Sequence, residues 1–191
     1  MIAFWTVALA LTLLLYVVLD GFDLGVGILF GFTRDENLKR EMLTSISPVW
    51  DGNETWLVLT ASILFGAFPL VYSLVLSAFY LPIILLLAAL IFRGVAFEFR
   101  ERSRTTRSFW DAGFSIGSMI AAFVQGAAVG AMVQGIPNLD GRFTGTPLGW
   151  LTPFSALCGA GLCVGACAHH RYSARLGRSA TMARPSRRHN G

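Results

Sequence analysis

Long apolar stretches separated by short polar segments dominate the pattern of this chain. The apolar stretches cover about residues 2–32, 48–67, 69–92, 111–134 and 151–167. The first four approach or exceed the roughly 20 residues that a helix needs to cross a bilayer, and the fifth stops short of that length. The pattern therefore predicts an all-α integral membrane protein: a bundle of four transmembrane helices plus an incomplete fifth.

Individual residues refine these spans. Ser47 followed by Pro48 predicts the N-cap and first residue of the second helix, because proline has no N–H and its backbone angle already suits a first turn. The second and third spans are so close that we expect a tight helical hairpin, and Pro82 should kink the third helix. The fourth span has glycines four residues apart, so we expect a buried helix whose Gln125 hydrogen-bonds to a neighbour.

The composition agrees with a membrane protein, since 54% of residues are hydrophobic, 14% are charged and the mean hydropathy is +0.61. The net charge of +4 arises at the C-terminal end. Six of the 15 Lys and Arg residues and all three His lie from Ala168 onward, where there is no acid. Because residues 168–191 lack apolar periodicity, we expect a basic disordered tail after a membrane domain at residues 1–167.

The basic residues between the spans predict an orientation. Four arginines follow the third span, namely Arg100, Arg102, Arg104 and Arg107. Loops that are rich in Lys and Arg stay on the cytoplasmic side of a membrane. We therefore expect cytoplasmic loops at residues 33–47 and 93–110, and an external N-terminus. Residues 2–19 carry no charge and no cleavage pattern, which favours a retained helix over a removed signal.

Acidic residues stand at the ends of two spans, where membrane helices rarely carry them. Asp20 and Asp23 follow the uncharged residues 2–19, where the first helix either ends in a glycine-rich turn or continues to residue 32, and Asp51 and Glu54 open the second span. In each pair, residues three apart share one helix face, and two carboxylates near lipid need a partner, water or a function. Two interpretations stay open for each pair. The acids are solvated in a turn or at the interface, or they form a site for proton transfer, gating or assembly.

Arg93 directly follows the apolar run of the third span. Its guanidinium either extends to the interface, which is usual at a helix end, or is held inward by an acid or a cofactor carboxylate. Residues 1–167 contain no histidine, so the membrane part lacks the usual axial ligand of haem. No Walker, dinucleotide or zinc signature is present either. We predict no metal site and no nucleic-acid partner.

Three segments, in this order, closely resemble subunit II of the cytochrome bd-type quinol oxidases. They read Asp20-Gly-Phe-Asp-Leu-Gly-Val-Gly, Pro48-Val-Trp-Asp-Gly-Asn-Glu-Thr-Trp and Phe92-Arg-Gly-Val-Ala-Phe-Glu-Phe-Arg, and the resemblance covers about residues 1–165. It implies a multi-pass subunit of a quinol:oxygen oxidoreductase in the bacterial plasma (inner) membrane, in contact with lipid and not catalytic alone. It also implies that the partner, subunit I, holds haem b and haem d and that this chain alone binds neither. Quinol would be the substrate of the complex, and a quinone site in this chain stays open.

The resemblance also implies roles for seven residues. The proton-transfer candidates are Asp51, Glu54, Asp23, Asp20 and Glu98, and the residues of the haem environment are Trp50 and Arg93. Asp51 matches the intramembrane acid of the family's proton pathway. Asp23 also matches a position that the family associates, like Arg93, with an intact haem environment at the subunit interface, without axial ligation. Glu98 matches an acid on the cytoplasmic side that could feed protons inward.

The chain departs from the family pattern in its length. Members of the family have two similar halves, and the resemblance here covers the first. The composition changes abruptly after about Gly165, from which we expect a truncated or frameshifted product. Two alternatives to an oxidase subunit stay open. One is a proton-coupled transporter or channel, because paired carboxylates and a proline-kinked helix also suit that class. The other is a non-functional remnant that inserts into the membrane without assembling.

Overall fold

The computed structural model describes residues 1–103 and 105–182, with side chains described as far as Tyr172. Within this part the architecture is all-α, as predicted. The helices are α1 (Ile2–Phe32), α2 (Glu36–Ile46), α3 (Trp50–Ala67), α4 (Pro69–Ala78), α5 (Tyr80–Arg102), α6 (Arg107–Gln134) and α7 (Pro153–Met182). Two short antiparallel strands, β1 (Asn138–Leu139) and β2 (Arg142–Phe143), form a hairpin between α6 and α7. By length and composition, α1, α5 and α6 qualify as membrane spans among the described residues.

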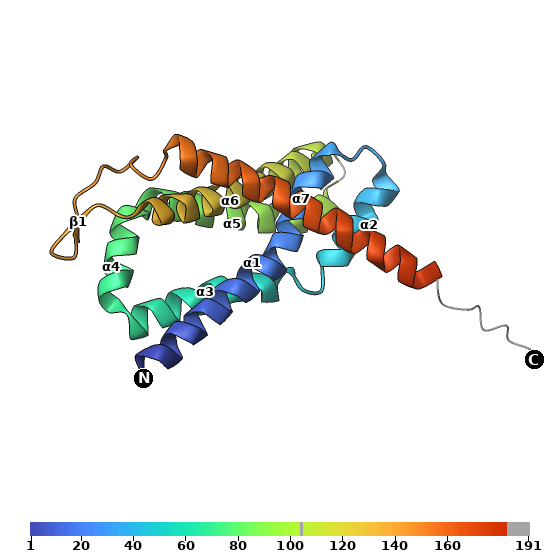
Figure 1. Ribbon diagram of the computed structural model, residues 1–191. Helices are drawn as coiled ribbons and strands as arrows, with labels where there is room; N and C mark the ends of the chain where they lie inside the picture. The colour runs from blue at the N-terminus through green and yellow to red at the C-terminus, as the bar shows by residue number, and fades with distance from the viewer. Residues whose placement is uncertain (104, 183–191) are drawn as a thin grey trace, which may run out of the picture.

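Helix α6 lies at the centre of the fold, against α5, α7 and α1 (Figure 1). Small side chains make this approach possible, since Ala121, Ala122 and Ala127 of α6 are fully buried. The Gln125 amide donates a hydrogen bond to the Tyr16 hydroxyl of α1 at 2.7 Å. The prediction of a buried fourth helix that hydrogen-bonds across the bundle is therefore confirmed.

Gly25 lies where α1 and α7 approach each other closely. A Cβ at this position would overlap the backbone carbonyl of Ala166, whereas a Cβ at Gly21, one turn earlier, would meet nothing within 4 Å. We expect Gly25→Ala to destabilise the chain by about 1–3 kcal/mol, because the backbone of α7 must move to accommodate the methyl group. The thermal unfolding midpoint in detergent measures this effect, and Gly21→Ala is the matched control. Equal midpoints for the two variants would show that α1 and α7 do not pack closely at Gly25.

Helices α3, α4 and α5 form three sides of an open frame and not the tight hairpin that we expected (Figure 1). The third predicted span, residues 69–92, is divided between α4 and α5 at Phe79. Pro82 explains the division: it has no N–H for the carbonyl of Ala78, four residues earlier, and its ring collides with that carbonyl. The proline thus separates two helices, where we had predicted a kink within one.

The segment expected to be a loop at residues 33–47 is mostly helical. Helix α2 begins with Asp35, whose carboxylate accepts a hydrogen bond from the Asn37 backbone N–H at 2.8 Å. It is amphipathic and buries Met42, Leu43 and Ile46. Pro48 cannot donate to the helix, so α2 ends at Ile46, just before it, and α3 starts only at Trp50, with Val49 as its N-cap. The predicted helix start at Ser47 and Pro48 is therefore wrong.

The second expected loop, residues 93–110, is also mostly helical. Helix α5 continues to Arg102 and α6 begins at Arg107, which leaves a connection of residues 103–106, where residue 104 lies outside the described part. The continuation of α5 has a buried face with Arg93, Ala96 and Arg100 at helical spacing. The sequence did not indicate this buried face, because two of its residues are arginines and buried arginines are rare.

The segment expected to be a disordered tail begins as part of α7. The helix runs to Met182, so the prediction is wrong for residues 168–182, and residues 183–191 lie outside the described part. Alanine, arginine and leucine favour a helix, and no proline occurs in this stretch before Pro185.

Candidate functional site

A fully buried arginine is at the centre of the candidate site. Arg93 of α5 has no exposed surface, and its Nη1 lies 3.3 Å from Oδ1 of Asp20 and 3.3 Å from Oε1 of Glu54. The guanidinium therefore joins α5 to α1 and α3. A charge taken out of water requires such partners. Of the two interpretations of Arg93, the structure selects the one in which acids hold it inward.

The two acids of α1 are buried as well. Asp20 and Asp23 have no exposed surface, and α1 continues past them to Phe32, so they do not lie in a wet turn. Asp23 Oδ2 accepts a hydrogen bond from Asn53 Nδ2 of α3 at 2.8 Å. Together with Glu54, these residues form what we call the Arg93 cluster: Asp20, Asp23, Asn53, Glu54 and Arg93.

Apolar side chains enclose the Arg93 cluster. Leu24, which follows Asp23 in α1, and Leu90, three residues before Arg93 in α5, are buried in one apolar core cluster, and Leu57 of α3 packs against it. Helices α1 and α6 pack closely because α1 has glycines on this side. At Gly27, for example, a Cβ would overlap the side chain of Ser118 of α6. The cluster thus lies in an environment where ionic interactions are stronger than in water and unpaired charges are costly.

Asp51, the principal candidate from the resemblance, lies outside this cluster. Its side chain is exposed in the first turn of α3. A groove between α3 and α5 passes beside it, lined by Trp50, Asp51, Glu54, Thr55, Leu57 and Val58 of α3 and by Leu87, Leu90, Ile91, Gly94 and Val95 of α5. Glu54 belongs to both sites, because its side chain is 22% exposed to the groove and is paired with Arg93. Glu54 therefore connects the groove surface with the buried ion pair.

Trp50 and Glu98 occupy different surroundings. The indole of Trp50 is half-buried in the groove, packs against Phe97 with 5.6 Å between ring centroids, and lies over Gly94. Glu98 is exposed and pairs with Arg102 at 2.9 Å on the outer face of α5. The structure thus brings Asp20, Asp23, Glu54 and Arg93 together, places Asp51 and Trp50 at the groove, and leaves Glu98 outside both.

A second ion network, which we did not predict, joins α2 to α5 and α6. Asp111 of α6 is paired with Arg100 and with Lys39, whose Nζ lies 2.6 Å from Oδ2 of Asp111. Glu36 accepts from Arg100 at 3.0 Å, and both cations also lie over the ring of Phe30, 4.9 and 5.1 Å from its centroid. One feature of the sequence could have indicated this network: Arg93 and Arg100 are seven residues apart and thus lie on one face of α5. This network brings the two basic segments to the same end of the bundle.

Tyr16 is a further buried polar residue that we did not predict. It is 2% exposed, and its hydroxyl accepts a hydrogen bond from Gln125. The signal was present in the pattern: Thr12, Tyr16 and Asp20 lie four residues apart on an otherwise apolar helix, and all three are buried. These residues form a polar stripe that leads to the Arg93 cluster.

The chemistry of the Arg93 cluster suits proton binding. The cluster contains three carboxylates and one guanidinium, so when fully ionised it has two surplus negative charges and becomes neutral by taking up two protons. It does not suit haem ligation, because carboxylates, an amide and a guanidinium are not the axial ligands that haem iron prefers. No cluster of metal ligands occurs among the described residues.

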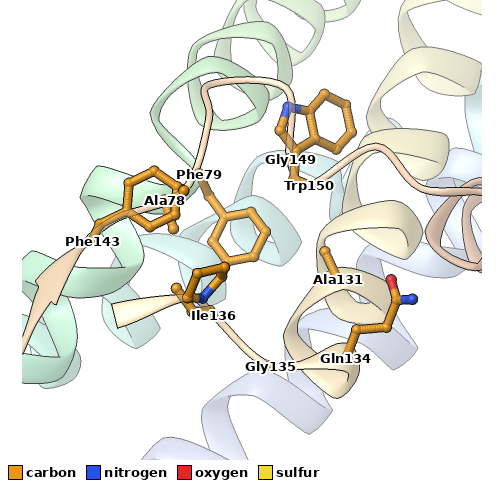
Figure 2. A pocket seen from close by; sticks show the side chains of 11 residues that line it. Ala78, Phe79, Ala131, Gln134, Gly135, Ile136, Phe143, Gly149 and Trp150 are labelled. Atoms are coloured by element: carbon orange, nitrogen blue, oxygen red, sulfur yellow. The ribbon is translucent and has the colours of Figure 1, made fainter. Parts of the chain in front are cut away.

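A separate cavity lies at the end of the bundle away from the ion network, beside the β-hairpin. Its volume is about 50 Å³, and Figure 2 shows the rings of Phe79, Phe143 and Trp150 around it. Gln134 is the polar side chain at its edge, and no charged residue lines it. This cavity therefore offers no group for acid–base chemistry, and the Arg93 cluster with its groove remains the candidate site.

Comparison with known proteins agrees with the resemblance seen in the sequence. A model of the family described as cytochrome bd terminal oxidase subunit II matches residues 1–171. The chain is 41% identical over 163 residues to cytochrome bd-I ubiquinol oxidase subunit 2 of Escherichia coli (strain K12), which covers 81% of this chain and 43% of that relative. It is 38% identical over 136 residues to cytochrome bd ubiquinol oxidase subunit 2 of Bacillus subtilis (strain 168), covering 70% and 40%.

The chain thus spans less than half the length of these curated relatives. The family match covers nearly all of the part whose side chains are described, including the Arg93 cluster and the groove. On this evidence, the chain belongs to the cytochrome bd terminal oxidase subunit II family.

Proposed function

We propose that this chain works as subunit II of a quinol-oxidising terminal oxidase and supplies part of its proton pathway. In that complex, quinol is oxidised and oxygen is reduced to water, and the chain is not catalytic alone. The observation that carries the proposal is the position of Glu54, which faces the groove and is also paired with the buried Arg93. The names of the relatives, both ubiquinol oxidase subunits, support the assignment to an oxidase.

In the proposed pathway, protons enter at Asp51 and pass through Glu54 to the Arg93 cluster. Asp51 is exposed at the groove, and Glu54, three residues further along α3, is its neighbour on the helix surface. Carboxyl groups transfer protons over hydrogen-bond distances, directly or through one water. Asp20 and Asp23 hold the charge of Arg93 in balance while protons move. Glu98, exposed on α5, collects protons at the cytoplasmic side.

The partner that we propose is subunit I, with haem b and haem d bound to it. The Arg93 cluster itself contains carboxylates, an amide and a guanidinium, none of which is a usual axial ligand of haem. The groove between α3 and α5 has exposed apolar side chains, such as Leu87 and Ile91, that suit a helical partner. We place Trp50 at this contact with subunit I. Arg93 is buried beneath the groove and influences the contact through its ion pair with Glu54. Quinol is the substrate of the whole complex.

We further propose a multi-pass arrangement in the bacterial inner membrane, with four complete spans, part of a fifth and an external N-terminus. The ion network supports the orientation, because it gathers Lys39, Arg100 and Arg107 at one end of the bundle. Positive residues favour the cytoplasmic side. The segments 33–47 and 93–110 then face the cytoplasm.

Substitution of Glu54 tests the proposed pathway. We expect Glu54→Gln to lower oxygen consumption by at least about tenfold in a complex coexpressed with a bd-type subunit I, because a proton-transferring group is lost. The haem content should stay unchanged, since Asp20 still balances Arg93. Glu41→Gln, at an exposed glutamate of α2, is the matched control. Normal turnover of a haem-complete Glu54→Gln complex would remove Glu54 from the pathway.

The same preparation separates the alternatives. If the tagged wild-type chain inserts but copurifies with no haem, it acts as a remnant and not as a subunit. A proton-coupled transporter would instead produce proton flux in vesicles that contain this chain alone. Copurification of a stoichiometric haem signal with quinol oxidase activity is the result that we expect.

A further inference from the structure

The hydrogen bond between Tyr16 and Gln125 joins two polar side chains in a part of the fold that is otherwise mostly apolar. The N-terminal half of α1 is mostly exposed and apolar, with residues such as Leu11, Leu14 and Val18 at its surface. Tyr16 in contrast is 2% exposed, and Gln125 Nε2 donates to its hydroxyl at 2.7 Å. A buried hydroxyl of this kind is costly unless its hydrogen-bonding capacity is used.

The hydrogen bond from Gln125 uses the Tyr16 hydroxyl as an acceptor and leaves its donor capacity unused. Tyr16 accepts from the amide, so its own O–H remains free to donate to another group. Asp20 lies one helical turn further along the same face of α1, and helical side chains lean toward the N-terminus, here toward Tyr16. Oδ1 of Asp20 faces Arg93, while Oδ2 is buried without a hydrogen-bond partner among the described residues.

We propose that Tyr16, held in place by Gln125, is the positioning residue of the Asp20–Arg93 ion pair. Its hydroxyl donates to Oδ2 of Asp20 and thereby keeps Oδ1 directed at Nη1 of Arg93. This contact satisfies two buried polar atoms at once, which is the arrangement that folded proteins favour. A continuous polar line then crosses four helices, from Glu54 of α3 through Arg93 of α5 and Asp20 and Tyr16 of α1 to Gln125 of α6.

The effect of Tyr16 on turnover rests on the proposed function, whereas the contact itself does not. If Asp20 is fixed, the counter-ion of Arg93 stays in place while Glu54 exchanges a proton with the groove. If Asp20 is free to rotate, Arg93 is drawn toward Glu54 and holds that carboxylate ionised. The loss of Tyr16 should therefore slow proton transfer without disturbing assembly.

The contact is tested on the isolated chain in detergent by infrared spectroscopy. The carboxyl band that disappears in Asp20→Asn identifies Asp20, and we expect Tyr16→Phe to shift this band because one hydrogen bond is lost. Gln125→Leu, which leaves the hydroxyl in place but unanchored, should broaden or shift the same band. Tyr80→Phe is the matched control, since Tyr80 is 50% exposed on α5. An unchanged Asp20 band in both Tyr16→Phe and Gln125→Leu would overturn the contact.

The positioning role is tested on the complex with subunit I. We expect Tyr16→Phe to lower the maximal rate of oxygen consumption about fivefold, the factor that corresponds to one hydrogen bond, with haem content and the KM for quinol unchanged. A shifted band with unchanged turnover would overturn the role of Tyr16 as a positioning residue. A wild-type chain that binds no haem-bearing partner would contradict the proposed function, and the infrared result would still decide the contact.

Discussion

Replacement of Arg93 by glutamine is expected to destabilise the chain by about 3–5 kcal/mol, the usual cost of leaving buried charges without a partner. Asp20 and Glu54 each pair with this guanidinium, and α1, α3 and α5 meet there. Glutamine removes the positive charge and leaves the carboxylates in an apolar enclosure. The thermal unfolding midpoint of the purified chain, together with its yield from detergent-solubilised membranes, measures the loss.

Two further variants make the Arg93 experiment decisive. Arg102→Gln is the matched control, because Arg102 is an exposed arginine of the same helix and its pair with Glu98 contributes only about 0.3–0.5 kcal/mol. Arg93→Lys keeps the charge, but its shorter side chain must bring one ammonium to the place where Nη1 meets both Asp20 and Glu54, so we expect an intermediate midpoint. If Arg93→Gln behaves like Arg102→Gln, the ion pairs of the Arg93 cluster do not hold the three helices together.

Replacement of Asp111 by asparagine is expected to be the second most damaging change, at about 3 kcal/mol. Asp111 is the shared partner of Lys39 and Arg100, and Arg100 is 5% exposed. Without this carboxylate, two cations face each other beside Phe30, with only the half-exposed Glu36 to compensate them. Helix α2 should then loosen from α5 and α6, because Lys39 loses its partner and the remaining contacts are the exposed ion pairs of Glu36 and the apolar face of Met42, Leu43 and Ile46.

Local and global effects of Asp111→Asn can be measured separately. Hydrogen exchange at residues 36–46 should increase more than in α6 itself, and the unfolding midpoint should fall. Asp140→Asn is the matched control, because Asp140 is exposed in the hairpin turn and its positive φ of 51° suits asparagine equally well. Unchanged exchange in α2 would mean that its apolar face alone anchors it.

Much of the helical framework followed from local patterns. The apolar runs predicted α1, α3 and α6 to within a few residues, because a lipid environment requires every backbone group to be paired within its own segment. Helix ends were harder to predict. Pro48 and Pro82 each ended a helix at a position that depends on which carbonyl lies four residues earlier, and charged residues concealed the helical periodicity of α2 and of the end of α5.

The candidate site shows the same division. The sequence by itself determined the family, the presence of acid pairs in two apolar spans and the glycine spacing that allows close packing, since each depends on the order and spacing of residues along one segment. Tertiary structure alone decided that Glu54 faces inward to Arg93 while Asp51 faces out, because residues three apart on a helix differ by about 60° in direction and the neighbouring helices select the buried one. Lys39 pairs with Asp111, 72 residues away, and Gln125 with Tyr16, 109 residues away. No local pattern encodes such partners, since they meet only when the packed helices bring them together.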